Sequence, residues 1–185
     1  NYTQPAYILK MDIRGYFMHI NREILVSLVH KSILRMADRP SDIAGYTWRQ
    51  RIDIPFLLYL TREVILLDPT INCRRVGSDS DWQGLPDSKS LFHTPAGCGL
   101  PIGNLTSQLF SNVYLNELDQ FIKRTLGCRH YGRYVDDFYI VHSSRDFLHT
   151  IIPRIFLFLF CNLRLELNPA KTRISTAHQG VEFLG

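Results

Sequence analysis

The pattern of apolar and polar positions changes its period along the chain, and each period predicts one kind of element. Residues 7–11 are apolar apart from Lys10 and predict a strand that ends at Asp12. Residues 22–36 carry apolar side chains at helical spacing behind Asn21, which suits an N-cap, so we expect a helix there. Residues 68–99 lose the pattern and are rich in Gly, Pro, Ser and Asp, which predicts irregular connections with room for a short hairpin.

Three further apolar blocks have helical spacing, and prolines or glycines mark their boundaries. Pro55 limits the start of the first block, Gly127 suits the C-cap of the second, and Pro153 bends or starts the third. We therefore expect helices at residues 54–67, 105–126 and 145–160.

Strand-like alternation appears in the last third of the chain. Residues 129–142 alternate and are rich in Tyr, Val and Ile, which predicts a hairpin with its turn at Asp136 and Asp137. Short strands are expected at residues 163–167 and 180–184.

The predicted order is strand, helix, insertion, helix, hairpin, helix, strand. Strands interleaved with helices, with one hairpin among them, predict an α+β fold with an antiparallel or mixed sheet and helices on one face. A β-α-β-β-α-β ferredoxin-like unit is the simplest arrangement that fits. We treat residues 1–185 as one folded region with an insertion at about 38–99.

Composition narrows the class of protein. The chain is 45% hydrophobic and 21% charged, which excludes a disordered or fibrous protein and allows a buried core. Its net charge of +4 is compatible with a nucleic-acid partner without requiring one. Polar residues interrupt the apolar run at residues 151–163, which is too short for the roughly 20 residues that span a bilayer, so we expect no membrane contact.

The cysteines are widely spaced and form no CxxC pair. This spacing argues against a zinc site and for free thiols in the reducing cytoplasm, where we expect the protein to be located. The residues are Cys73, Cys98, Cys128 and Cys161.

Three aspartates stand at the ends of apolar segments. Asp12 ends the first strand, and Asp136 and Asp137 lie together at the tip of the hairpin. Such carboxylates repel each other, and a divalent cation offsets their charge best, although Asp-Asp is also ordinary turn chemistry. If the two strands are neighbours, the acids can share two Mg²⁺ ions, or Mn²⁺ as a substitute, with the backbone carbonyl of Ile13 as a further ligand. That arrangement supports phosphoryl transfer.

Five segments resemble, in the family's own order, the motifs of reverse transcriptases, the RNA-directed DNA polymerases. The resemblance covers nearly the whole chain and implies a polymerase palm with part of the fingers. Upstream fingers and a thumb would lie outside these residues, so we expect this fragment to polymerise poorly by itself. The segments are residues 10–17 (KMDIRGYF, motif A), 99–108 (GLPIGNLTSQ, motif B), 134–137 (YVDD, motif C), 168–172 (NPAKT, motif D) and 180–185 (GVEFLG, the start of the motif E primer grip).

The resemblance implies roles at the matched positions. Asp12, Asp136 and Asp137 would be the metal-binding catalytic acids. Phe17 would be the steric gate that excludes a ribose 2′-OH, the alternative being a core aromatic residue. Lys171 would approach the triphosphate or assist proton transfer, the alternative being an exposed loop lysine. The other implied substrate-binding residues are Ile13, Arg14, Gly15, Tyr16, Pro101, Ile102, Gly103 and Gln108, and the primer grip would include Phe183, Leu184 and Gly185.

Motif B departs from the usual family pattern, which reads QGxxxSP. Ile102 stands in place of Gln, and Gln108 stands in place of Pro. The sequence IGNLTSQ, with LNELD after it, is similar to the reverse transcriptases of diversity-generating retroelements, which copy template RNA with frequent errors at adenines. An aliphatic side chain in place of an amide could remove on the order of 1 kcal/mol of discrimination, so we hypothesise that Ile102 lowers fidelity. The alternative is that Ile102 only packs.

The family resemblance also implies partners: an RNA template, a DNA or RNA primer, dNTPs, and a basic accessory protein as a further candidate. Three basic groups could contact backbone phosphates or could form an ordinary solvated surface. They are Lys123, Arg124, Arg129, His130 and Arg133; Arg49, Arg51 and Arg62; and Arg74 with Arg75.

Two other functions stay open on the sequence alone. One is a reverse transcriptase of group II intron, retron or phage-defence type, which IGNLTSQ and the error spectrum would separate from the diversity-generating type. The other is a nonenzymatic nucleic-acid-binding domain on the same scaffold. The three acids argue against the second, since a binding module gains nothing from carboxylates that face phosphates.

Overall fold

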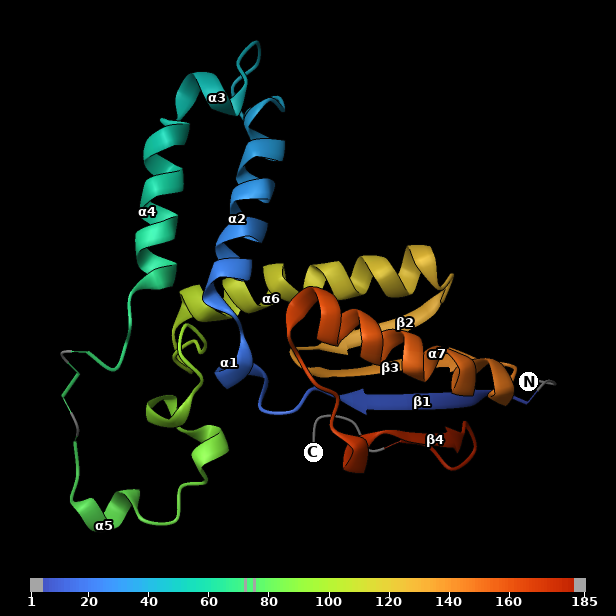
Figure 1. Cartoon of the computed structure of the whole chain (residues 1–185). Helices are drawn as coiled ribbons and strands as arrows, with labels where there is room; N and C mark the ends of the chain where they lie inside the picture. Colours follow the sequence, from blue (N-terminus) through green and yellow to red (C-terminus); the bar gives the residue numbers. More distant parts are fainter. Residues whose placement is uncertain (1–4, 72, 75, 182–185) are drawn as a thin grey trace. The chain divides into compact units, whose positions relative to one another are not determined.

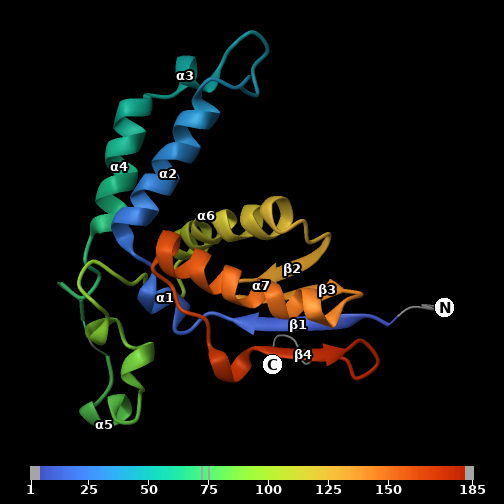
Figure 2. The ribbon, with the colours of Figure 1, turned by 45° about the vertical axis from the view of Figure 1, so that its right-hand side comes forward.

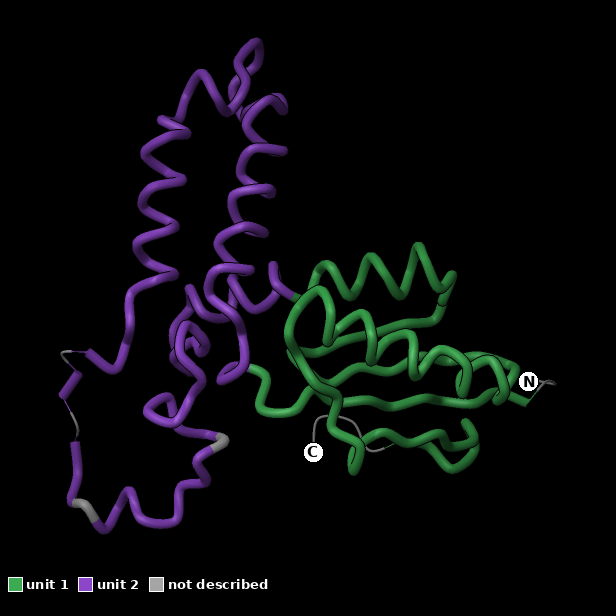
Figure 3. Tube along the Cα trace, viewed as in Figure 1, with its two compact units in different colours: residues 1–16, 115–185 green, residues 17–114 purple. Residues whose placement is uncertain are grey.

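The structure is a computed structural model that describes residues 5–71, 73–74 and 76–181 (Figure 1). The chain divides into two compact units (Figure 3). Unit 1 contains residues 1–16 and 115–185, and unit 2 contains residues 17–114. Each unit has its own set of buried apolar side chains, such as Leu9 in unit 1 and Leu25 in unit 2.

Unit 1 is built on the strands β1 (Tyr7–Asp12), β2 (His130–Tyr134), β3 (Asp137–His142) and β4 (Arg173–Thr176). Its helices are α7 (Arg145–Phe158) and the part of α6 (Leu105–Gln120) from Leu115 onward. The strands form an antiparallel sheet in the order β2-β3-β1-β4. Both helices lie on one face of this sheet (Figures 1 and 2). The strand order and the β-α-β-β-α-β chain order confirm the predicted ferredoxin-like α+β arrangement.

Alternation along the strands separates an apolar face from a polar one. On β1, Leu9 and Met11 are fully buried, whereas Lys10 between them lies on the opposite face. On β3, Phe138 and Ile140 are fully buried in the same way. Burying each such side chain stabilises the fold by about 1.5–3 kcal/mol, so the helices cover this face and leave the other face for polar residues.

Helix α7 continues as a π-helical segment, Leu159–Leu163, and supplies much of the core. The combined helix Arg145–Leu163 is long and apolar enough to cross a membrane by length and composition alone, so the apolar stretch is longer than expected. A row of its side chains is buried in unit 1, as in a core helix that packs on a sheet. That row is Leu148, Ile151, Ile155, Leu159 and Leu163.

Unit 2 contains two long helices, α2 (Arg22–Ala37) and α4 (Ile54–Leu66), which pack side by side (Figure 1). The predicted cap of α2 is confirmed, because Asn21 Oδ1 accepts a hydrogen bond of 3.0 Å from the Ile24 amide. The buried Arg22 donates from Nη1 to the carbonyls of Leu66 and Leu67, at 3.3 and 3.0 Å. A cation there satisfies the last carbonyls of α4 and ties the end of α4 to the start of α2.

Several predicted boundaries are wrong. Residues 163–167 do not form a strand, because Leu163 ends the helix, Arg164 adopts φ 53° and only Leu167 forms an isolated bridge, with Ile13. The apolar alternation there reflects burial of Leu165 rather than strand pairing. Strand β4 was missed.

The predicted hairpin is not found in the described part of residues 68–99, which instead form short helical turns. Of the strand expected at 180–184, Gly180 and Val181 are not in a strand, and the other residues lie outside the described part of the chain. The remaining short elements are α1 (Tyr16–His19), α3 (Trp48–Arg51), α5 (Asp79–Trp82) and the 3-10 turns Asp87–Lys89, Leu91–His93 and Pro169–Lys171, and α6 continues as the π-helical segment Phe121–Thr125.

Candidate active site

The three predicted acids lie together at one end of the unit 1 sheet. Asp12 ends β1 and is paired directly opposite Asp137, the first residue of β3. Asp136 lies in the turn just before β3. Burial, with the charges of Asp12 and Asp137, raises the pKa of Asp136 above its usual value. Because like charges opposite each other on neighbouring strands are destabilising, this cluster needs cations close by.

Asp12 is held by two residues of the segment that follows α7. Asn168 Nδ2 donates to Asp12 Oδ1 at 3.3 Å, and Lys171 Nζ donates to Oδ2 at 2.8 Å. The backbone adds a hydrogen bond of 2.8 Å from the Asn168 amide to the Asp12 carbonyl. The Lys171 side chain is 60% exposed, and its hydrogen bond with Asp12 raises its pKa, which keeps it charged. Lys171, from the predicted motif D, therefore contacts Asp12, from the predicted motif A, directly.

Asp137 is paired with a different lysine. Lys10 Nζ lies 3.1 Å from Asp137 Oδ2, and both side chains are less than one-fifth exposed, at 19% and 17%. The other carboxylate oxygen, Asp137 Oδ1, is buried without a hydrogen-bond partner in the described part of the chain. A buried carboxylate oxygen with no donor is unfavourable, so Asp137 keeps an unused capacity to bind a cation.

The turn that carries Asp136 has an unusual backbone. Val135 adopts φ 55°, in the left-handed region that a β-branched residue rarely enters. The turn is centred on Val135 and Asp136, one residue earlier than predicted, because Asp137 already pairs with Tyr134 and Asp12. Strain of this kind is tolerated where surrounding contacts hold the backbone, and such positions cluster at functional sites.

A pocket of about 790 Å³ opens on the polar face of the sheet around this cluster. Carboxylates and cationic side chains share its wall, which suits a ligand that brings both phosphate groups and bound cations. Arg173, opposite Lys10 on β4, adds a third cation to the wall. The lining residues are Lys10, Asp12, Tyr134, Val135, Asp136, Asp137, Lys171, Arg173, Ser175, Gly180 and Val181.

The donor set fits hard cations bound in an open site. Among the described residues, no three His, Cys, Asp or Glu side chains converge as a group that could hold a metal by themselves. Mg²⁺ needs no such cage, since it binds through one or two carboxylates and completes its shell with water and substrate phosphates. The unpartnered Asp137 Oδ1 and the clustered charge around Asp136 are the features that such an ion would satisfy.

The other motif A residues differ in their surroundings. Ile13 is buried and bridges Leu167, but the hydrogen bonds on either side use the Asp12 carbonyl and the Arg14 amide, so the Ile13 carbonyl takes no part in them. Arg14 is exposed near Glu166, at 3.9 Å. Gly15 adopts φ 52°, and Tyr16 is buried. The predicted metal and substrate roles of these residues stay predictions.

The remaining predicted site residues belong to unit 2 or to the undescribed end of the chain. Phe17 is half-buried and its carbonyl accepts a hydrogen bond of 2.9 Å from the Leu100 amide. Gly103 adopts φ +97° in the loop before α6, a conformation that suits glycine, whereas Ile102 is 66% exposed. Pro101 is half-buried and Gln108 is exposed, and Phe183, Leu184 and Gly185 lie outside the described residues.

Sequence reasoning missed several residues of the site. Lys10 could have been found, because residues two apart on a strand share a face and Asp12 was already singled out. Asn168 and Arg173 could not be found in this way, because the sequence does not show which segments lie beside β1. Arg133 was assigned to a basic surface group, but its side chain is only 10% exposed and pairs with Asp119.

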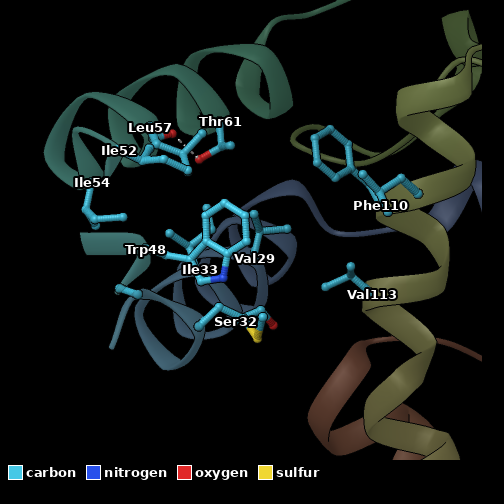
Figure 4. A pocket seen from close by; sticks show the side chains of 13 residues that line it. Val29, Ser32, Ile33, Trp48, Ile52, Ile54, Leu57, Thr61, Phe110 and Val113 are labelled. Atoms are coloured by element: carbon cyan, nitrogen blue, oxygen red, sulfur yellow. Dashed lines mark hydrogen bonds between the residues drawn. The ribbon is translucent and has the colours of Figure 1, made fainter. Parts of the chain in front are cut away.

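Unit 2 contains a second, chemically different pocket, of about 380 Å³ (Figure 4). It is lined by apolar side chains from α2, α3, α4 and the first half of α6, including Val29, Trp48 and Phe110. Its two hydroxyl groups are already used, because Ser32 donates to Leu28 and Thr61 to Leu57. The pocket has no charged or titratable wall and offers no group for phosphoryl transfer.

The ferredoxin-like sheet, with its clustered carboxylates and neighbouring lysines, is consistent with the palm class of nucleotidyl-transfer domain. A sequence model of the reverse transcriptase (RNA-dependent DNA polymerase) family matches residues 1–185. The chain therefore belongs to the reverse transcriptase family, whose general activity is RNA-directed DNA synthesis. No curated protein sequence matches the chain.

Proposed function

We propose that this protein synthesises DNA on an RNA template at the carboxylate cluster of unit 1. The observation that supports this most is the convergence of Asp12, Asp136 and Asp137 at one end of the sheet, in a chain of the reverse transcriptase family. Unit 1 would then be the palm, and unit 2 would be part of the fingers. Its partners would be an RNA template, a primer and dNTPs.

The three acids, with the Ile13 carbonyl, would hold two Mg²⁺ ions. When bound, such ions stabilise the attacking and leaving oxygens of an in-line phosphoryl transfer. Lys10 keeps the Asp137 carboxylate in place from the same face of the sheet. The exposed ammonium of Lys171 can leave Asp12 for a substrate phosphate or pass a proton to the departing diphosphate. Arg173 offers a planar donor group for another phosphate oxygen.

We further propose that the enzyme is error-prone and of the diversity-generating type. This rests on the motif B sequence, in which Ile102 replaces the usual glutamine. The side chain of Ile102 is 66% exposed, which argues against a role in packing alone. An exposed aliphatic group in a substrate-binding loop offers no hydrogen bond, so on the order of 1 kcal/mol of discrimination would be lost.

The test is primer extension by the full-length enzyme on a primed RNA template with Mg²⁺ and dNTPs. An Asp136→Asn/Asp137→Asn variant should lose incorporation by at least about 1000-fold, because the cation site loses two of its three carboxylates. Asp146→Asn, which removes an exposed acid from the first turn of α7, is the matched control and should keep it. A folded, RNA-binding enzyme without Mg²⁺-dependent incorporation would favour a nonenzymatic binding domain.

Sequencing the products tests the lineage separately. Errors concentrated at template adenines would support the diversity-generating type, and an Ile102→Gln variant should then make several-fold fewer of them. Faithful products would still support polymerase activity but would assign the enzyme to the group II intron, retron or defence type. Unchanged misincorporation in Ile102→Gln would remove the proposed role of that side chain.

A further inference from the structure

Arg133 lies on the face of the sheet away from the pocket. On β2 it pairs with the fully buried Phe138, whereas the next residue, Tyr134, lines the pocket. The Arg133 side chain is 10% exposed and does not line the pocket. It therefore has no route to a bound substrate from this position, and any effect on the reaction must pass through another residue.

The guanidinium of Arg133 is fixed by a carboxylate on α6. Its Nε donates to Asp119 Oδ1 at 2.8 Å, and its Nη2 donates to Oδ2 at 2.7 Å. The Tyr131 hydroxyl also donates to Asp119 Oδ1, at 2.6 Å. A two-pronged arginine–carboxylate pair sets the plane and direction of the guanidinium, and the third donor holds the carboxylate itself.

The remaining edge of the guanidinium reaches the catalytic turn. Arg133 Nη1 donates to the Val135 carbonyl at 2.9 Å. Val135 is the residue with φ 55°, a conformation that costs a residue with a Cβ roughly 1–2 kcal/mol. A charge-assisted hydrogen bond of about 1.5–3 kcal/mol is large enough to offset that cost. Arg133 makes this bond from the face of the sheet opposite the pocket.

We propose that Arg133, braced on Asp119, is a positioning residue that holds Val135 in its left-handed conformation and so places Asp136 beside Asp12. The inference rests on the function proposed above. Lysine cannot replace the arginine, because one ammonium group cannot donate to both Asp119 oxygens and to the Val135 carbonyl in a fixed plane. Glycine at position 135 would need no brace, because it enters the left-handed region without a Cβ clash.

A purely structural ion pair predicts a different outcome from a positioning residue. If the pair served stability alone, Arg133→Lys would lower the unfolding temperature, but folded enzyme would keep its turnover. If Arg133 positions the turn, turnover falls in folded enzyme, and the size of the fall depends on residue 135.

The experiment is a double-mutant cycle on the full-length enzyme with Arg133→Lys, Val135→Gly and both together. The kcat and the KM for dNTP are measured at a temperature where circular dichroism shows every variant folded. We expect Arg133→Lys to lower kcat about 10–100-fold with KM changed less than about threefold, and to lower it less than about threefold when Val135→Gly is present. Arg154→Lys, an exposed arginine of α7, is the control.

Hydrogen–deuterium exchange of residues 130–142 gives a second readout that needs no activity. Arg133→Lys should speed exchange at the turn, and Val135→Gly should reduce that increase. An unchanged kcat, or equal losses with Val and Gly at position 135, would overturn the inference. If the wild type incorporates no nucleotide, the proposed function fails, and the exchange cycle alone decides whether Arg133 holds the turn.

Discussion

The turns at Gly103 and Val135 both enter the left-handed region of backbone conformation, and they do so in opposite ways. In unit 2, Gly103 adopts φ +97°, and a Cβ there would meet no atom within 4 Å. In unit 1, Val135 adopts φ 55° despite its branched side chain, and Arg133 donates to its carbonyl. At Gly103 the loop is open and glycine supplies the conformation, whereas at Val135 the strain is accepted because a buried charged group holds the backbone.

The largest expected change in the free energy of unfolding comes from removing the Arg133 side chain, which holds the unit 1 turn. Among the described residues, Arg133→Met would leave Asp119 with only the Tyr131 hydroxyl as a side-chain partner, and the Asp119 side chain is 23% exposed. Removing one member of a buried pair costs about 3–5 kcal/mol, and the partial exposure of Asp119 brings our expectation to about 2–3 kcal/mol. Urea denaturation of the purified protein measures the change in the free energy of unfolding.

An exposed pair in the same unit is the control for this prediction. Arg14 and Glu166 lie 3.9 Å apart with side chains 68% and 57% exposed. Arg14→Met should change the free energy of unfolding by less than about 0.5 kcal/mol, because exposed pairs contribute little. Equal effects of the two substitutions would mean that Arg133 contributes no more than a surface residue.

The stability of the unit 2 turn should depend mainly on whether residue 103 carries a side chain, because glycine there makes no side-chain contact that could be lost. Gly103→Ala introduces a Cβ at positive φ and should destabilise by about 1–2 kcal/mol, although the site has space. Gly103→Asn should cost clearly less, because asparagine tolerates the left-handed region better. Thermal unfolding of both variants checks this, and two unchanged melting temperatures would mean that the loop does not keep its positive φ.

The same contrast shows why part of the site could be predicted from the sequence and part could not. Asp12, Asp136 and Asp137 were found because acids at the ends of apolar segments are conspicuous in a short window, and so was the cap at Asn21. Arg133 was misassigned because its partner lies 14 residues earlier on another element. A charged residue in an alternating strand is expected to be exposed. Only the position of Asp119 on α6 shows that Arg133 is buried as half of an ion pair.

Element boundaries failed for a related reason. Residues 163–167 alternate, yet their apolar side chains are buried without a neighbouring strand that pairs with them throughout. Strand β4 has a weak apolar pattern and exists because β1 offers it a free edge. Pairing partners are a property of the folded chain, so a local pattern could predict the order of elements but not these two segments.

Neutralising one acid of the cluster should stabilise the metal-free protein. The pKa of Asp136 is raised in the folded state by burial and by Asp12 and Asp137, so its charged form opposes folding at neutral pH. Asp136→Asn should therefore raise the free energy of unfolding at pH 7 in EDTA. The cost of burying the charged Asp136 carboxylate is lost as pH falls through its raised pKa. The wild type and Asp136→Asn should therefore become equally stable in acid.

Adding Mg²⁺ should make the wild type more stable than Asp136→Asn, the reverse of their order in EDTA. The wild type should gain thermal stability from the ion, whereas Asp136→Asn should gain less, because it lacks one of the proposed ligands. Asp146→Asn on α7 is the control, and it should be neutral or slightly destabilising in EDTA, since it removes an acid from a helix N-terminus. A stabilisation by Asp146→Asn equal to that by Asp136→Asn would attribute the effect to net charge rather than to the cluster.

The smallest predicted effect is the most direct comparison of the two turns, because Val135→Gly gives the unit 1 turn the residue type of the unit 2 turn. Relief of left-handed strain should stabilise by about 1–2 kcal/mol, and the greater freedom of glycine in the unfolded chain should cost about 0.5–1 kcal/mol. The expected net gain is about 0.5 kcal/mol. The same substitution at Val141 of β3, where φ is not positive, has no strain to relieve and should destabilise by about 1 kcal/mol or more. Equal losses at both positions in chemical denaturation would show that packing of the Val135 side chain outweighs its strain, and the turn would then need no brace.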